Sequence, residues 1–256
     1  MQIDVKGISA NYVKSGNGDA VLILPGWGAV SSVYNMLIQQ LSENYCVYAL
    51  DLPGFGITPE PAQPWCVDDY ADFVTAFIKA VEIKKVMLVG HSYGGRIIIK
   101  LCNRQLNFEI SEILFIDSAG IRRQATEKQS AKQKRYKTLK KFFSSKPMSS
   151  LFPDAIEKLQ KKYGSADYAA ASPVMRQTLV KSISEDLTPL LSNIKVKSTL
   201  VWGRDDTATP YSDALTFNKE IKNSKLFVID NAGHFPFIDQ PFDFRKIIAS
   251  QYNLSL

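Results

Sequence analysis

The sequence predicts an α/β fold with a mostly parallel, doubly wound sheet that is interrupted once by an inserted helical segment. Short, nearly continuous apolar runs end repeatedly in Pro, Gly or Asp, and segments with helical spacing separate them. Buried parallel strands read as such runs, and they alternate with helices along the chain. This alternation stops over residues 121–190. The 256 residues suffice for one large domain that carries such an insertion.

The first half of the chain is predicted to contain several strand–helix units. Residues 1–18 alternate like a half-exposed strand, and the apolar run within 20–28 stops at Pro25-Gly26. The run within 45–56 ends similarly, at Asp51 and a Pro/Gly loop. Further strands are expected at 84–90 and 112–120, and helices at 31–42, 67–83 and 93–105.

The alternation resumes near the C-terminus. The sequence predicts strands at 197–203 and 224–230, a helix at about 211–221 and a closing helix from about 239. The chain is therefore divided into a core, residues 1–120 and 191–256, and a helical insertion, residues 121–190.

The insertion carries the positive charge of the protein. The net charge is +6, and residues 121–190 contain 15 Lys and Arg against 6 Asp and Glu. A nucleic-acid-binding patch is one interpretation. The alternative, which we favour, is a solvated helix face, because Tyr136, Leu139 and Phe143 recur among the lysines at near-helical spacing. We therefore expect no specific nucleic-acid partner.

The remaining composition favours a cytoplasmic protein without a metal site, a cofactor or a membrane span. Cys46, Cys66 and Cys102 are widely spaced and form neither a disulfide framework nor a metal-ligand pair. Only two histidines occur, His91 and His234, which excludes a histidine-rich metal site. No apolar run approaches the ~20 residues that span a bilayer, and the N-terminus lacks a signal-peptide core.

One short stretch carries the strongest chemical signal. The segment GHSYG, residues 90–94, fits G-x-S-x-G directly between an expected strand and an expected helix. A serine in this bend exposes its hydroxyl at the carboxyl edge of the sheet, where open parallel sheets place their sites. Ser92 needs a positioned base to act as a nucleophile. Because His91 precedes the serine and points away from the corner, the predicted base is His234, in the loop after the strand at 224–230.

An acid that orients the base is expected after another strand, between Ser92 and His234 in the sequence. Asp205 and Asp206 follow the strand at 197–203. Asp206 is the first choice and Asp205 the reserve. Both could instead cap the helix that begins near residue 210, but a cap needs only one side chain.

With these residues the chain resembles the α/β-hydrolases over essentially its whole length. In that family the acid lies in a G-x-x-D-x-x-x-P segment, which corresponds to residues 203–210 and selects Asp206 over Asp205. DLPGFG at 51–56 and NAGHFPF at 231–237 also resemble family signatures. The motifs are specific as a set, because they occur in the expected order and context.

The resemblance implies an oxyanion hole made by the backbone N–H groups of Trp27 and Tyr93. The segment LPGWG, residues 24–28, is similar to the family's H-G-x-G segment, with Pro25 where histidine is usual. Since the donor is a backbone group, this departure leaves the Trp27 N–H available. The predicted substrate-binding residues are Gly26 and Asn35.

The implied activity is hydrolysis of a small carboxylic ester or a related acyl substrate. The protein is expected to be a monomer or a homodimer. His234 would take the Ser92 proton, Ser92 would attack the carbonyl, and water would release the acyl group from the enzyme. Residues 121–190 take the place of the family's helical cap, or lid, which covers the site and shapes its substrate pocket.

Two alternatives remain open. The segments 26–35 and 202–206 are similar to those of meta-cleavage-product hydrolases, which implies hydrolysis of a carbon–carbon bond in a vinylogous diketo acid. A different class of function is a non-catalytic homologue that binds a ligand in its cavity. Loss of Ser92, Asp206 or His234 would support that class, and none of the three is lost.

Overall fold

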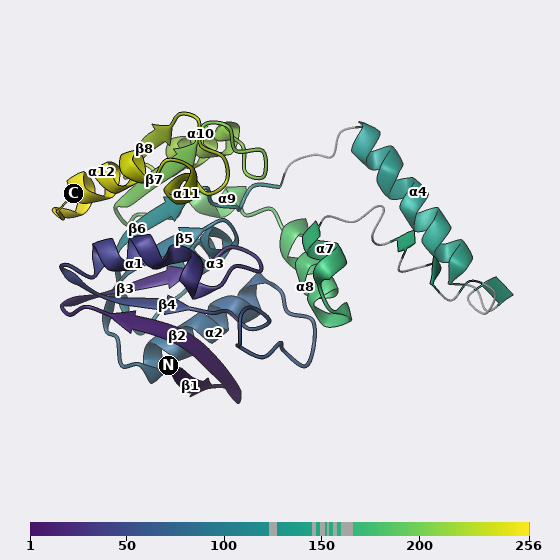
Figure 1. The fold of residues 1–256 in the computed structure, drawn as a ribbon, viewed down its shortest axis with the longest axis horizontal. Helices are drawn as coiled ribbons and strands as arrows, with labels where there is room; N and C mark the ends of the chain where they lie inside the picture. Colours follow the sequence, from purple (N-terminus) through teal and green to yellow (C-terminus); the bar gives the residue numbers. More distant parts are fainter. Residues whose placement is uncertain are drawn as a thin grey trace.

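The fold is built on one mixed sheet, mostly parallel (Figure 1). The computed structural model describes residues 1–122, 127–144, 147–148, 152, 154–155, 158–159 and 166–255. Within them, the strands are β1 (Gln2–Val5), β2 (Ile8–Ser15), β3 (Asp19–Leu24), β4 (Tyr45–Leu50), β5 (Lys85–His91), β6 (Glu109–Ile116), β7 (Ser198–Gly203) and β8 (Ser224–Ile229). Their order is β1-β2-β4-β3-β5-β6-β7-β8, and only the β1-β2 and β2-β4 pairs are antiparallel.

Helices cover both faces of the sheet, as the sequence predicts. One face carries α2 (Val67–Ala80), α3 (Tyr93–Cys102), α9 (Thr188–Leu191) and α10 (Tyr211–Glu220). The other carries α1 (Asn35–Leu41), α11 (Pro236–Asp239) and α12 (Pro241–Tyr252). A short 3-10 turn, η1 (Ser31–Tyr34), leads into α1, so the helix predicted at 31–42 forms in two parts.

The central strands are apolar throughout because both of their faces are buried. Every residue of β7 is buried, and so is every residue of β5 after Lys85. The parallel register places Leu24 beside Gly90, and Gly90 beside Phe115. The loops that follow β3, β5 and β6 therefore leave the sheet at one edge, which is where the polar residues of the predicted site lie.

Residues 121–190, which we call the β6–β7 segment, contain α4 (Glu127–Phe143), α7 (Ala166–Ala170) and α8 (Pro173–Ser184). Of these, α8 lies beside the core, whereas α4 lies farther out (Figure 1). Ser172 caps α8 by accepting a hydrogen bond from the Met175 N–H. At the other side, Thr178 Oγ1 accepts a hydrogen bond from the Trp65 N–H at 3.0 Å. The Thr178–Trp65 contact ties α8 to the loop between β4 and α2.

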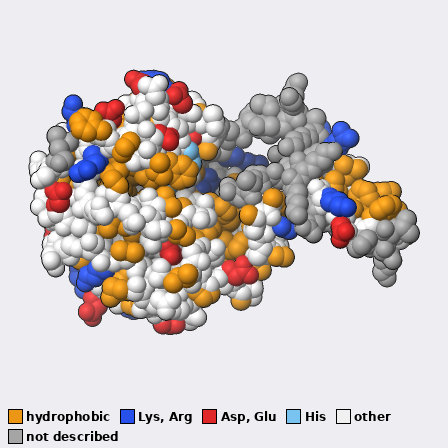
Figure 2. All heavy atoms as spheres, viewed as in Figure 1, with side chains coloured by type: hydrophobic (Ala, Val, Ile, Leu, Met, Phe, Trp, Pro, Cys, Tyr) orange, Lys and Arg blue, Asp and Glu red, His pale blue; other side chains and the backbone are white. Residues whose placement is uncertain are grey.

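The described basic side chains of α4 face solvent. Five are exposed in the described part of this helix: Lys134, Arg135, Lys137, Lys140 and Lys141. Figure 2 shows basic and hydrophobic side chains together on the projecting segment. Across the described residues, no helix combines the length and the apolar character that crossing a membrane requires.

Candidate active site

Ser92 lies at the turn between β5 and α3 in a backbone conformation that few non-glycine residues adopt, with φ +48° and ψ −110°. Its N–H donates to the Ile116 carbonyl at 3.1 Å, which ties the turn to β6. The following strand-to-helix turn needs glycine at Gly94, because a Cβ there would stand 2.1 Å from the Leu24 carbonyl oxygen. Glycine at this position therefore lets the start of α3 pack closely against the end of β3.

Ser92, His234 and Asp206 form one hydrogen-bonded chain. Ser92 Oγ lies 2.8 Å from His234 Nε2, and His234 Nδ1 lies 2.8 Å from Asp206 Oδ2. Since a carboxylate only accepts, Nδ1 carries the ring proton and Nε2 is free to accept the serine proton. The three residues come from the loops after β5, β8 and β7, so the structure brings together groups that are up to 142 positions apart.

Asp206 is held in place by several donors. Its Oδ1 accepts the N–H groups of Ala208 and Thr209, at 2.7 and 3.1 Å, and its Oδ2 accepts the Thr209 hydroxyl at 2.6 Å. Burial acts to raise its pKa, but the hydrogen bonds from His234 and Thr209 outweigh burial and hold the pKa at about 2. Asp206 is therefore ionised at neutral pH. Asp205, the reserve choice, is exposed.

The loop after β3 approaches the serine closely. A Cβ added at Gly26 would stand 3.2 Å from the Ser92 Cβ and 2.9 Å from His91 Nδ1, so glycine permits this approach. The Gly26 N–H itself donates to the Tyr34 hydroxyl at 2.9 Å. Neither the Trp27 nor the Tyr93 N–H donates a hydrogen bond to any residue in the described ranges. Both backbone donors predicted for the oxyanion hole are thus available.

His91 connects the two sides of the site. Its Nδ1 lies 2.9 Å from the Tyr34 hydroxyl, and its Nε2 lies 2.8 Å from the His234 carbonyl oxygen. The ring donates through Nε2 and accepts the hydroxyl proton at Nδ1, while the hydroxyl oxygen accepts the Gly26 N–H. Complete burial lowers the His91 pKa to about 3, so the ring is neutral. His91 is not the base for Ser92, and through its two hydrogen bonds it links the Gly26 loop to the His234 loop.

Replacing Tyr34 by phenylalanine is expected to lower the free energy of unfolding by about 1–3 kcal/mol, because the Gly26 N–H and His91 Nδ1 would lose their buried partner. Urea unfolding of the variant measures this change. Tyr45→Phe is the matched control, because Tyr45 is half-buried and its hydroxyl has no hydrogen-bond partner among the described residues. Equal unfolding free energies for both variants would contradict the prediction.

A cluster of aromatic rings lies beside the serine, and Tyr93 is part of it. The Trp27 ring makes edge contacts with Phe55 and Tyr93, with centroids 5.0 and 5.3 Å apart, and Tyr70 packs against Tyr93 at 5.5 Å. The Tyr93 hydroxyl also lies 2.9 Å from Ser182 Oγ on α8. The sequence did not predict this contact, because it indicated a role only for the backbone N–H of Tyr93 and none for its side chain.

Asn35, predicted to contact substrate, is the first residue of α1, and its side chain is exposed. In the described part of the chain, that side chain makes no hydrogen bond with the site. Its role in binding stays a prediction. The preceding residue, Tyr34, is the one that contacts the site, through Gly26 and His91.

Part of the site is open to solvent. The His234 side chain is 21% exposed, whereas His91 is buried. Figure 2 shows a histidine side chain at the surface beside a band of hydrophobic side chains. The base is therefore in part accessible from solvent.

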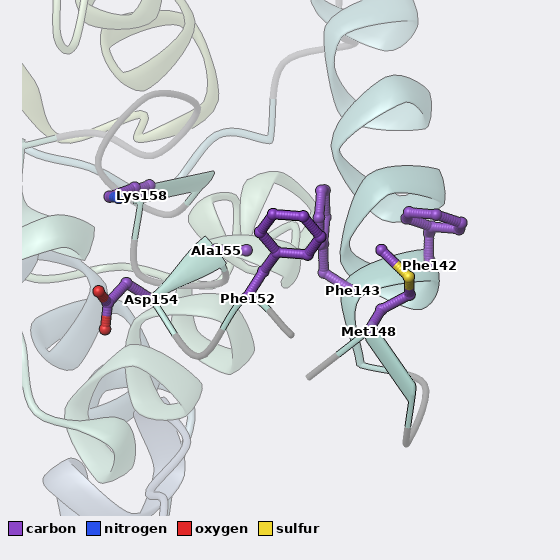
Figure 3. A pocket seen from close by; sticks show the side chains of 7 residues that line it. All are labelled: Phe142, Phe143, Met148, Phe152, Asp154, Ala155 and Lys158. Carbon is purple, nitrogen blue, oxygen red and sulfur yellow. The ribbon is translucent and has the colours of Figure 1, made fainter. Parts of the chain in front are cut away.

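A separate cavity of about 530 Å³ lies in the β6–β7 segment (Figure 3). Its lining comes from this segment alone: Phe142, Phe143, Met148, Phe152, Asp154, Ala155 and Lys158. The elements that carry Ser92, Asp206 and His234 do not line it. This cavity is therefore distinct from the serine site.

Three possible metal ligands lie at the site: the carboxylates of Asp117 and Asp206 and the ring of His234, with ligand atoms within 4.8 Å of one another. The His234 Nδ1, however, carries a proton that it donates to Asp206. A protonated ring nitrogen cannot bind a metal. The hydrogen-bonding pattern fits proton transfer better than metal binding.

The parallel sheet, the serine at the strand-to-helix turn and its chain of hydrogen bonds define the class of the α/β-hydrolases. The sequence profile for the alpha/beta hydrolase fold matches residues 19–241. The chain belongs to this family of hydrolases, and the predicted fold class and family are confirmed.

The chain is similar to hydrolases that are named for different substrates. The chain is 23% identical to the 2-hydroxy-6-oxo-2,4-heptadienoate hydrolase of Pseudomonas putida, over 94% of this chain and 92% of that one. It is 25% identical to the pimeloyl-[acyl-carrier protein] methyl ester esterase of Chromobacterium violaceum, over 91% and 94% of the two chains. The solved structure of the esterase EaEST from Exiguobacterium antarcticum matches 98% of both chains, with a TM-score of 0.75 and 22% identity.

Proposed function

We propose that the protein is a serine hydrolase that cleaves a small carboxylic ester, or a related acyl substrate, through Ser92, His234 and Asp206. The observation that carries the proposal is the chain of two 2.8 Å contacts from Ser92 Oγ through the His234 ring to Asp206 Oδ2. A serine, a base and an orienting acid in this geometry are the parts that acyl transfer requires.

In the proposed reaction, His234 Nε2 accepts the Ser92 proton as Oγ attacks the substrate carbonyl carbon. The ionised Asp206 stabilises the imidazolium that forms. The N–H groups of Trp27 and Tyr93 donate to the oxyanion, and the protonated His234 returns its proton to the leaving alcohol. Water, deprotonated by His234, then attacks the acyl-enzyme, and the acid leaves with Ser92 regenerated.

We propose an apolar acyl group for the substrate. The half-buried Trp27 ring, which packs on the buried rings of Phe55 and Tyr93, supports this choice because it presents an apolar side chain next to the residue that follows Ser92. The likeness to a methyl ester esterase supports the choice of an ester bond. We further propose that residues 121–190 form the cap over the core, which consists of residues 1–120 and 191–256, because α8 contacts the loop before α2 and the side chain of Tyr93.

The second candidate is hydrolysis of a carbon–carbon bond, which the likeness to the heptadienoate hydrolase supports. A panel of p-nitrophenyl esters of increasing acyl length, assayed beside one vinylogous diketo acid, separates the two candidates. We expect turnover of short esters to exceed that of the diketo acid in kcat/KM. The reverse order would favour the second candidate and would leave the nucleophile assignment intact.

A fluorophosphonate probe tests the nucleophile directly. We expect covalent labelling of Ser92 in the folded protein, identified by peptide mass spectrometry, and no labelling after denaturation, because the serine is activated only by its folded partners. If the folded protein stays unlabelled, the enzyme proposal is wrong, and the non-catalytic, ligand-binding function is favoured.

A further inference from the structure

Asp117 lies directly after β6, is fully buried, and takes no part in the reaction proposed above. Its φ is +38°, which is uncommon for a residue other than glycine. Its N–H donates to the Val201 carbonyl at 3.1 Å, and its Oδ1 accepts the Gly203 N–H at 2.9 Å. Both partners belong to β7, so the carboxyl group is held at the end of the strand that leads to Asp206.

The second carboxyl oxygen of Asp117 has a different environment. Oδ2 accepts no hydrogen bond from any residue that the structure describes. The carboxyl group instead lies beside that of Asp206, with a carboxyl oxygen of each residue within 4.8 Å of the other. Two carboxyl groups this close at a buried site do not both stay ionised, so one of them holds a proton.

The surroundings place that proton on Asp117. The Asp206 carboxylate receives hydrogen bonds from His234, from the Thr209 hydroxyl and from two backbone N–H groups, whereas the Asp117 carboxyl group receives one, from Gly203. Four donors stabilise the charged form of Asp206, and one donor does little for the charged form of Asp117.

The charged and titratable groups around Asp117 also favour its protonated form. They are the carboxyl groups of Asp206 and Asp239, the ring of His234, and the neutral ring of His91 on the neighbouring strand β5. Burial, together with the negative charges of Asp206 and Asp239, raises the Asp117 pKa to about 9, although the Gly203 hydrogen bond opposes this. Asp117 is neutral at physiological pH.

We propose that Asp117 is a positioning residue: as a neutral carboxylic acid it donates a hydrogen bond from Oδ2 to Asp206 and fixes the carboxylate that orients His234. The effect on turnover rests on the proposed function. The protonation state of Asp117 does not, so the two can be tested separately.

Two variants at this position test the effect on turnover. Asp117→Asn keeps a donor where Oδ2 lies and cannot ionise, so kcat at pH 7.5 should stay within about threefold of the wild type. Asp117→Ala removes the donor and should lower kcat by about 10–100-fold, with KM little changed, as is usual for supporting residues of a site. Full kcat in Asp117→Ala would overturn the proposal.

The pH profile separates positioning from a merely structural role. In the wild type, kcat should fall as the pH rises through about 9, because ionised Asp117 cannot donate and adds a charge beside Asp206. Asp117→Asn should lack this fall, and Asp205→Asn, an exposed acid on the same edge, should retain it. A fall that persists unchanged in Asp117→Asn would overturn the proposal.

Stability gives a readout that needs no activity. The folded-state pKa of Asp117 is raised above the ordinary aspartate value of about 3.9. Its contribution to stability is thus fully present below pH ~4 and is lost as the pH rises through about 9. Between these values the unfolding constant of the wild type should rise relative to that of Asp117→Asn, by up to about tenfold per pH unit. A pH-independent ratio would overturn the proposal.

Infrared spectroscopy of the wild type tests the protonation state of Asp117 without a variant, so it also applies if Asp117→Asn does not fold. At pH 7 we expect the carbonyl band of one protonated carboxylic acid, which should disappear above pH 9. Absence of the band at pH 7 would overturn the proposal. If the band is present but Ser92 resists the fluorophosphonate probe, the proposed function fails and the carboxylic acid assignment stands.

Discussion

Replacing Ser92 by alanine is expected to lower kcat for a p-nitrophenyl ester by about 10⁴-fold or more, because the variant lacks the nucleophile to which His234 Nε2 is hydrogen-bonded. The fold should be preserved. The φ of +48° at this position is strained for alanine as it is for serine, so circular dichroism and the urea midpoint should change little. Initial rates at saturating ester measure the effect.

Ser212→Ala is the matched control, because Ser212 is an exposed serine on α10 whose side chain makes no hydrogen bond with Ser92, His234 or Asp206. Its kcat should equal that of the wild type. A Ser92→Ala enzyme that kept a tenth of the wild-type rate would contradict the proposed nucleophile.

Replacing Asp206 by asparagine is expected to lower kcat by about 10⁴-fold, the cost of holding the base in the wrong tautomer. An amide in place of Asp206 Oδ2 can donate to His234 Nδ1, which moves the ring proton to Nε2, where it can no longer accept from Ser92. Rates from pH 6 to 9 measure the loss, which should persist at every pH in this range.

Asp205→Asn makes the same chemical change one residue away on an exposed side chain, and its kcat should stay within about twofold of the wild type. The comparison is sharp because the two acids share one loop. If Asp206→Asn kept its activity and Asp117→Asn lost it, Asp117 would be the orienting acid, and the positioning role proposed for it would be wrong.

The sheet and the order of its elements were predictable because their signals are local. Each buried strand is a continuous apolar run, and each run ends where Pro, Gly or Asp begins a loop, as at Pro25 and Asp51. The candidate nucleophile was visible for the same reason, since Ser92 lies between glycines that the strand-to-helix contact requires. His234 followed because only two histidines exist.

The supporting residues were not predictable, because their partners are far away in the sequence. Tyr34 meets His91 across 57 positions, and Tyr93 meets Ser182 across 89. No periodicity or spacing records such contacts. Asp117 had a weak signal, as an acid directly after a buried strand, but its meaning depends on how Asp206 is oriented by the neighbouring β7 loop.

The contacts of α8 limit which parts of the β6–β7 segment can be exchanged without disturbing Ser92. Helix α3, which begins one residue after Ser92, also holds α8: Tyr93 contacts Ser182, and the Arg96 guanidinium donates to the Glu185 carbonyl. A graft that exchanges the stretch from Pro173 to Glu185 would therefore disturb the nucleophile. Exchange confined to α4 would leave these bonds in place, so a library of chimeras should draw its variation from α4.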